Sequence, residues 1–251
     1  MKRETQNVLL LLVGGALIKI TIDGSYLRYV KPVMGPWLVA AGAVTVALAV
    51  IAIARDIRAS RPAEPATTDA PEPQCASTGH DHNSRSPWLL LLPVLVIFLI
   101  APPALGADAA NRAGTRTLTA PGGSDSHRAP FPPLPPGDVT TLRFVDLVTR
   151  AGWDSAGTLD NRTLRITGFI THSKTGEPLL TRIVINCCAA DAFPIHVRLA
   201  GPQLAQYRDD QWLTVTGIVE PYTATEGNRY TPTFHVRTAT PITPPADPYE
   251  S

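Results

Sequence analysis

Long apolar runs fill roughly the first hundred residues, and alternating apolar and polar positions replace them near residue 140. The runs 8–27 and 32–54 are each about 20 residues long and almost free of charge, which is the length that a helix needs to cross a bilayer. A third run, 87–105, is of similar length but contains several prolines. The pattern predicts two transmembrane helices in residues 1–54 and a third at 87–105. A cleaved signal-like segment is the alternative for the third run, because small residues follow it.

Two polar segments separate these parts of the chain. Residues 55–86 are rich in Pro, Ala, Thr and charge, and such a composition buries too little apolar surface to fold, so we expect a disordered loop. The loop carries Cys75, His80 and His82, which could hold zinc, although a solvated polar loop explains them as well. Residues 106–138 are rich in Gly, Ser, Thr and Pro, a composition typical of an extended linker.

From residue 139 the pattern indicates a small, mainly-β domain. Apolar residues at helical spacing in 141–152 predict a short helix. Five runs with a period of two follow and predict strands at 164–170, 180–186, 195–199, 212–219 and 230–238. Because a short helical stretch separates the third strand from the fourth, the order favours an OB-like five-stranded barrel preceded by a helix, with a β-sandwich as the alternative. We place this domain at 139–240 and a disordered tail at 241–251.

Two glycines inside the predicted strands support the barrel. Gly168 lies in LRITGFI and Gly217 lies in LTVTGIV. A glycine inside a strand is typical of a bulge or of a tight bend, where a side chain does not fit. The two segments therefore predict local bends in the sheet.

Charge restricts the partners and sets an expected orientation. The chain has 22 basic and 21 acidic residues, so it lacks the positive surface of a nucleic-acid binder, and we expect no nucleic-acid partner. Basic residues near the apolar runs favour a cytoplasmic N-terminus and a cytoplasmic 55–86 loop. We therefore expect a multi-pass protein of the cell membrane, in contact with lipid, whose C-terminal domain is extracytoplasmic. The basic residues behind this orientation are Lys2, Arg3, Arg55, Arg58, Arg61 and Arg85.

The adjacent cysteines Cys187 and Cys188, in INCCAADAFP, are the least common chemical feature of the sequence. Neighbouring side chains of a strand point to opposite faces, so both thiols face one ligand only at a bulge or a strand end. Three interpretations stay open: buried inert thiols, a vicinal disulfide, or metal ligands together with Asp191 or His196. No histidine is evidently paired with either thiol, so we expect no catalytic residue and no enzyme.

The segment RIVINCCAADAFPIHVRL, with LRITGFI before it and WLTVTGIVE after it, resembles the C-terminal signature of a bacterial family of permease-subunit membrane proteins. That family has N-terminal transmembrane helices and an OB-like C-terminal domain. The resemblance implies that Cys187, Cys188 and Asp191 are marked positions, and His80 and His82 resemble the histidines of its loop. It also implies a polytopic permease-like partner and a link to zinc homeostasis.

These observations lead to one expectation and two alternatives. We expect a non-enzymatic accessory subunit of a membrane permease complex, with zinc as the candidate metal. The first alternative is a metal-binding or metal-delivery protein that acts through Cys187 and Cys188, and the second is a thiol redox protein. The candidate metal ligands are Cys187, Cys188, Asp191, His80 and His82.

Overall fold

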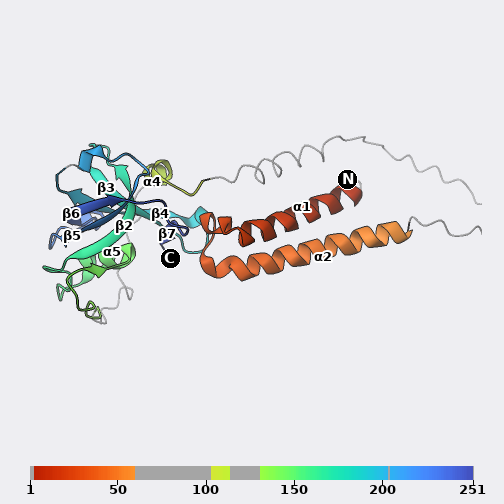
Figure 1. Ribbon diagram of the computed structural model, residues 1–251, viewed down its shortest axis with the longest axis horizontal. Coiled ribbons are helices and arrows are strands. Elements are labelled where there is room, and N and C mark those ends of the chain that lie inside the picture. Colours follow the sequence, from red (N-terminus) through yellow and green to blue (C-terminus); the bar gives the residue numbers. More distant parts are fainter. Residues whose placement is uncertain (1–2, 60–102, 114–130, 203, 251) are drawn as a thin grey trace, which may run out of the picture. The chain divides into compact units, whose positions relative to one another are not determined.

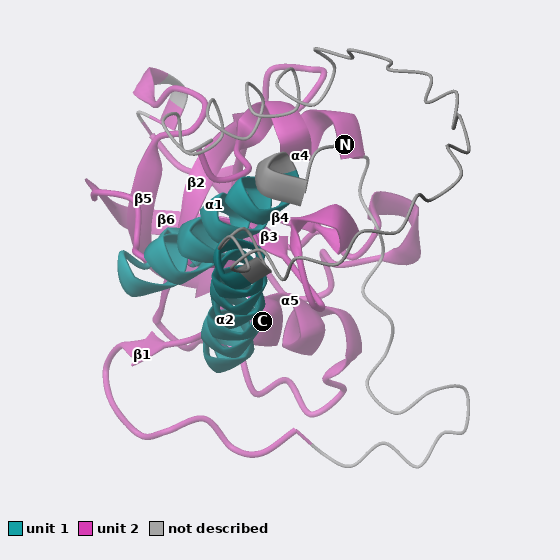
Figure 2. Ribbon diagram, turned by 90° about the vertical axis from the view of Figure 1, so that its right-hand side faces the viewer, with its two compact units in different colours: residues 1–26, 33–102 teal, residues 27–32, 103–251 magenta. Residues whose placement is uncertain are grey.

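The computed structural model describes residues 3–59, 103–113, 131–202 and 204–250. Two compact units divide the chain: residues 1–26 and 33–102 form unit 1, and residues 27–32 and 103–251 form unit 2 (Figure 2). The predicted loop with Cys75, His80 and His82 lies outside the described residues from position 60 onwards. So does the third predicted transmembrane helix, except for residues 103–105, which are not helical.

Unit 1 is a pair of antiparallel helices, α1 (Arg3–Ile22) and α2 (Gly35–Ala59), which lie side by side (Figure 1). Helix α1 ends before the predicted boundary at residue 27, because Gly24 adopts a φ of 76° that turns the chain out of the helix. A Cβ atom on Gly14 would lie 2.8 Å from Cγ2 of Val46 and 2.9 Å from the carbonyl oxygen of Gly42. The helices approach this closely because both crossing positions are glycine.

One stretch within the described residues, Pro32–Arg58, is long and apolar enough to cross a membrane, and the apolar stretch Gln6–Ile22 of α1 is shorter. The connection between the helices contains two 3₁₀ turns, η1 (Ser25–Arg28) and η2 (Pro32–Met34). The two helices that the hydrophobic runs predict are therefore present, and by length and composition one of them qualifies as a span.

Unit 2 is built on a mixed seven-stranded sheet. Its strands are β1 (Thr140–Thr141), β2 (Leu164–His172), β3 (Pro178–Val184), β4 (Phe193–Ala200), β5 (Trp212–Val219), β6 (Thr233–Pro241) and β7 (Tyr249–Glu250). The order is β1-β2-β5-β6-β4-β3-β7, and β2 also pairs with β3. The pairs β1–β2, β4–β6 and β3–β7 are parallel, and the others are antiparallel. The five predicted strands are confirmed as β2 to β6.

Two helices pack on this sheet (Figure 1). Helix α5 (Phe144–Trp153) confirms the predicted short helix. Its apolar side enters the main core, which also contains Leu164, Ile166, Leu180, Ile195, Val197, Leu213, Val215 and Phe234. Helix α4 (Ala107–Ala113) and strand β7 form a second, smaller core with Phe169, Ile183, Ile185 and Trp212. Three further 3₁₀ turns, η3 (Ala189–Asp191), η4 (Leu204–Gln206) and η5 (Glu226–Asn228), lie in the connections.

Two elements of the second core lie in segments that the sequence analysis placed outside the β domain. Residues 107–113, placed in an extended linker, form α4 because Ala107 and Ala110 are buried against the sheet. Residues 249–250, placed in a disordered tail, form β7 because Tyr249 is 3% exposed and pairs with Ile183. Burial of these few side chains stabilises segments that have too little sequence for a recognisable period.

The two strand glycines lie where the chain leaves no space for a side chain, as predicted. A Cβ atom on Gly217 would be 2.0 Å from the carbonyl oxygen of His235, and the register between β5 and β6 shifts between Thr216 and Gly217. A Cβ atom on Gly168 would be 2.7 Å from the carbonyl oxygen of Thr181. Both glycines therefore allow a close backbone approach.

We expect Gly217→Ala to lower the free energy of unfolding by about 2 kcal/mol or more, because the added methyl group displaces a backbone carbonyl in the sheet. Thermal unfolding of the full-length protein, followed by circular dichroism, measures the loss. Gly227→Ala is the matched control, since the nearest atom to its added Cβ would be 3.9 Å away. Equal melting temperatures for the two variants would contradict this account of the bulge.

Candidate metal centre

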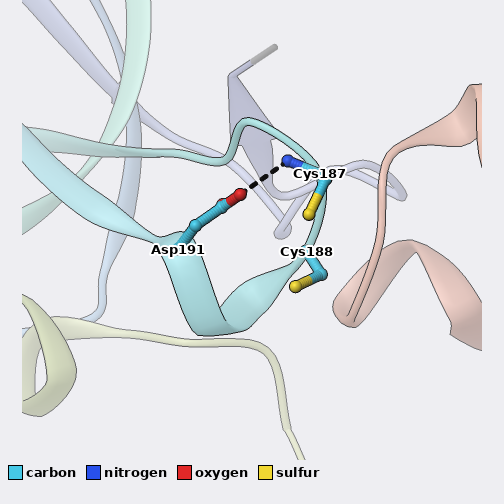
Figure 3. A group of neighbouring side chains, drawn as sticks. All are labelled: Cys187, Cys188 and Asp191. Atoms are coloured by element: carbon cyan, nitrogen blue, oxygen red, sulfur yellow. Dashed lines mark hydrogen bonds between the residues drawn. The ribbon is translucent and has the colours of Figure 1, made fainter.

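The turn that follows β3 is held by the carboxylate of Asp191. The Asp191 Oδ1 atom accepts a hydrogen bond from the backbone N–H of Asn186 at 2.9 Å, and Oδ2 accepts one from the N–H of Cys187 at 2.8 Å (Figure 3). The N–H of Asp191 donates back to the carbonyl oxygen of Cys188 at 3.1 Å. The chain therefore leaves the core after Ile185, which is 1% exposed, and closes into η3.

This turn brings the two sulfur atoms together. The Sγ atoms of Cys187 and Cys188 and a carboxylate oxygen of Asp191 all lie within 4.8 Å of one another. Figure 3 shows the three side chains gathered at the turn. Cys188 is still extended, with φ −152° and ψ 171°, and the 3₁₀ turn begins directly after it. The predicted strand end is confirmed, and it is what lets adjacent side chains share one site.

The solvent exposure of the two cysteines tests the interpretation that both are buried, inert thiols. Cys187 is exposed, Cys188 is partly buried, and both thiols are free. The interpretation as two buried, inert thiols is therefore wrong for Cys187. Asp191 is also partly buried, so a ligand approaching from solvent meets Cys187 first.

The electrostatics of the turn keep one proton on sulfur. A hydrogen bond with Cys188, a hydrogen bond with the Asp191 carboxylate and desolvation raise the pKa of the Cys187 thiol to about 11. Desolvation raises the pKa of Asp191, but the hydrogen bonds that its carboxylate accepts outweigh it and hold that pKa below its ordinary value. At neutral pH the turn therefore presents a protonated Cys187 and an ionised Asp191.

The three histidines of the described β domain lie away from this turn. His196 Nδ1 is 2.8 Å from the hydroxyl of Thr181, and burial together with the charge of Arg229 lowers the pKa of His196 to about 4. His172 pairs with Asp209 at 2.7 Å, and His235 pairs with Glu220 at 3.0 Å. Asp191 thus joins the two sulfur atoms, and His196, the other partner that the sequence suggested, does not. His80 and His82 lie outside the described residues.

A short segment from the helix connection adds to the turn. Residues 27–32 belong to unit 2, and Val30 forms an antiparallel bridge with Cys188. The N–H of Ala189 donates to the carbonyl oxygen of Tyr29 at 2.7 Å, and the N–H of Lys31 donates to that of Cys187 at 3.3 Å. The sequence carries no signal for this pairing, because more than 150 residues separate the partners.

An open, mainly apolar pocket of about 330 Å³ borders the same turn. Ala189, Ala192 and Phe193 line it on one side, and Ala109 and Ala110 of α4 line it on another. The lining also includes Arg112 of α4, so a basic side chain borders the otherwise apolar pocket.

The fold and the site define a β domain with a Cys-Cys-Asp group at one strand end, in which Cys187 is exposed. Residues 142–250 match the family described as the DUF1980 C-terminal domain, so such a domain is present in this chain and contains all three residues of the group. The match agrees with the resemblance to an uncharacterised family, and it does not bear on a permease. Comparisons with curated proteins and with solved structures found no match.

We expect Cys187 in the metal-free protein to react with iodoacetamide roughly tenfold more slowly at pH 8 than an exposed reference cysteine. A pKa near 11 lowers the thiolate fraction roughly 100-fold, and the greater nucleophilicity of a more basic thiolate offsets about half of that on a logarithmic scale. Peptide mass spectrometry across pH 7 to about 11 measures the rate at each cysteine.

The rate should rise with pH up to the pKa of the thiol, and Asp191→Asn should move this rise to lower pH because it removes a negative charge. Asp209→Asn, which removes an acidic group that pairs with His172, is the control. A Cys187 thiol that reacts at pH 7 as fast as at pH 10 would contradict the raised pKa.

Proposed function

We propose that the β domain binds a borderline divalent metal ion, zinc foremost, through Cys187, Cys188 and Asp191. The observation that supports this function is the convergence of two sulfurs and one carboxylate oxygen within 4.8 Å. In a tetrahedral zinc site with Zn–S bonds of about 2.3 Å, two sulfur ligands lie about 3.8 Å apart. The separations of the three atoms here are at most 4.8 Å, and thiolate and carboxylate are both donors that zinc accepts.

Protonation makes this binding dependent on pH. A metal ion binds thiolate, so it has to displace the proton that the raised pKa keeps on Cys187. The affinity for zinc is therefore expected to rise with pH over the neutral range. Asp191 needs no deprotonation there, and its carboxylate has further lone pairs besides the two that accept the backbone N–H groups.

The number of ligands favours transfer over a structural role. Structural zinc sites are closed by four protein ligands, whereas three protein ligands leave one position for water or for a group from a partner. Cys187 is exposed, so a partner can reach the ion. We therefore assign the chain to metal binding and delivery, which the sequence analysis raised as an alternative.

The raised pKa of Cys187 speaks against the thiol redox alternative, because redox-active thiols need a stabilised thiolate. The accessory role beside a permease stays a prediction, as do the absence of an enzymatic activity and of a nucleic-acid partner. Exposed apolar side chains along α2, among them Val44, Leu48 and Ile51, suit contact with lipid or with the helices of such a partner.

The proposal extends to the architecture around the site. The pairings β2–β5, β5–β6, β6–β4, β4–β3 and β3–β2 lead back to the starting strand, which supports an OB-like barrel inside the larger sheet. Lipid contact by α2 is supported by the length and apolar composition of Pro32–Arg58, and lipid contact by α1 by its shorter apolar stretch Gln6–Ile22. The extracytoplasmic placement of the β domain stays a prediction from the flanking charges.

We expect the full-length protein to remain in the membrane fraction after an alkaline carbonate wash, because spanning helices are held by the hydrocarbon core and not by charge. Immunoblotting of the pellet and the supernatant measures this. Recovery of the whole chain in the supernatant would rule out a membrane anchor.

We expect one zinc ion per chain for the full-length protein in mild detergent, measured by competition with a chromophoric chelator. Cys187→Ser and Cys188→Ser each remove a sulfur ligand and should lower the affinity at least 100-fold, and Asp191→Asn should lower it by a smaller factor. Cys75→Ser is the matched control and should bind as the wild type does. A wild type without zinc, or unchanged binding by both serine variants, would overturn the proposal.

A further inference from the structure

One buried hydroxyl group joins the two parts of the chain that enter unit 2 from the N-terminal side. The Tyr249 hydroxyl donates a hydrogen bond to the carbonyl oxygen of Arg28 at 2.8 Å and accepts one from the backbone N–H of Leu105 at 3.0 Å. Arg28 lies in the connection between α1 and α2, and Leu105 lies two residues before the start of α4. The Tyr249 side chain is 3% exposed, so both bonds are made by a hydroxyl group on a buried ring.

The backbone of Tyr249 is held in place by strand β3 and by the side chain of Arg182. Strand β7 pairs in parallel with β3, and the Arg182 guanidinium donates to the carbonyl oxygen of Tyr249 at 2.9 Å and to the Glu250 carboxylate at 3.2 Å. The same guanidinium lies 5.0 Å from the ring centre of Trp212. A charged group held by hydrogen bonds and by an aromatic face has little freedom, so the phenol is presented in one orientation.

The segment that Tyr249 holds at Arg28 continues along the backbone to the candidate metal ligands. Arg28, whose carbonyl the phenol holds, is followed by Tyr29, Val30 and Lys31, the residues that pair with the Cys187–Ala189 backbone. The position of the two cysteines therefore depends on a segment that Tyr249 fixes at its start. Two backbone hydrogen bonds, from Ala189 to Tyr29 and from Lys31 to Cys187, transmit this constraint to the turn.

We propose that Tyr249 is a positioning residue for the Cys-Cys-Asp site: its hydroxyl latches residues 28–31 onto the cysteine turn and so couples metal binding to the connection between α1 and α2. The metal part of this inference rests on the proposed function. Because coupling between two sites is reciprocal, a latch that strengthens metal binding is itself strengthened by the metal. The bound ion then tightens the segment that joins the two helices, and release of the segment loosens the ion.

Tyr249→Phe tests this inference, because it removes the hydroxyl and keeps the buried ring. Hydrogen exchange of the full-length protein in detergent reports directly on the amides of Lys31 and Ala189. In the metal-free variant we expect these amides to exchange roughly fivefold faster than in the wild type. Exchange in β2 and β5, measured in the same samples, shows that the sheet is folded.

The effect of zinc on hydrogen exchange separates a positioning role of Tyr249 from a merely structural one. In the wild type, zinc should slow exchange at Lys31 and Ala189, and in Tyr249→Phe this protection should shrink while the zinc affinity falls roughly fivefold. Tyr222→Phe is the matched control, since that side chain is 93% exposed. Unchanged exchange in metal-free Tyr249→Phe overturns the latch, and faster exchange with unchanged zinc affinity overturns the coupling.

Failure of the proposed function gives a different result. If the wild type binds no zinc, the metal assignment is lost, and the latch is judged on exchange in the metal-free proteins alone. Faster exchange at Lys31 and Ala189 in Tyr249→Phe then still supports a latch between Tyr249 and the helix connection.

Discussion

The two hydrogen bonds that the Asp191 carboxylate accepts are the interaction on which the site depends. Without them the chain could continue past Asn186 as an extended strand, and the side chains of Cys187 and Cys188 would point to opposite faces. The two bonds, from the N–H groups of Asn186 and Cys187, hold the chain in the turn instead.

The same carboxylate also determines the chemistry of the turn. Its negative charge helps to keep the proton on Cys187, so the free thiol is a poor nucleophile, and the proposed metal binding requires the loss of this proton. The surrounding fold supports this turn from several distant segments: β3 leads into it, η3 closes it, and residues 28–31 pair along it. A site assembled in this way is sensitive to the position of each segment, which is why a single hydroxyl on β7 can matter to it.

Regular periods made most of the fold predictable from the sequence. Runs such as 164–170 and 212–219 alternate over enough residues to identify a strand, and Gly217 inside one of them correctly indicated a bulge. Two hydrophobic runs likewise identified α1 and α2. The strand end at Cys187 and Cys188 could also be inferred, because the residues after it do not alternate.

The missed elements are short or depend on distant partners. Strand β7 has two residues and α4 has seven, which is too few for a period, and both are stabilised by burial in the second core. The pairing of Val30 with Cys188 joins two distant segments, and no local sequence pattern predicts that they meet. Local patterns thus located the candidate ligands, while the tertiary contacts that position them needed the structure.

Zinc K-edge X-ray absorption of the zinc-loaded, full-length protein tests the central claim most directly, because it counts the atoms bound to the ion. The account predicts two sulfur neighbours at about 2.3 Å and lighter oxygen or nitrogen neighbours at about 2.0–2.2 Å. A first shell without sulfur would contradict it, since it would place the ion away from Cys187 and Cys188.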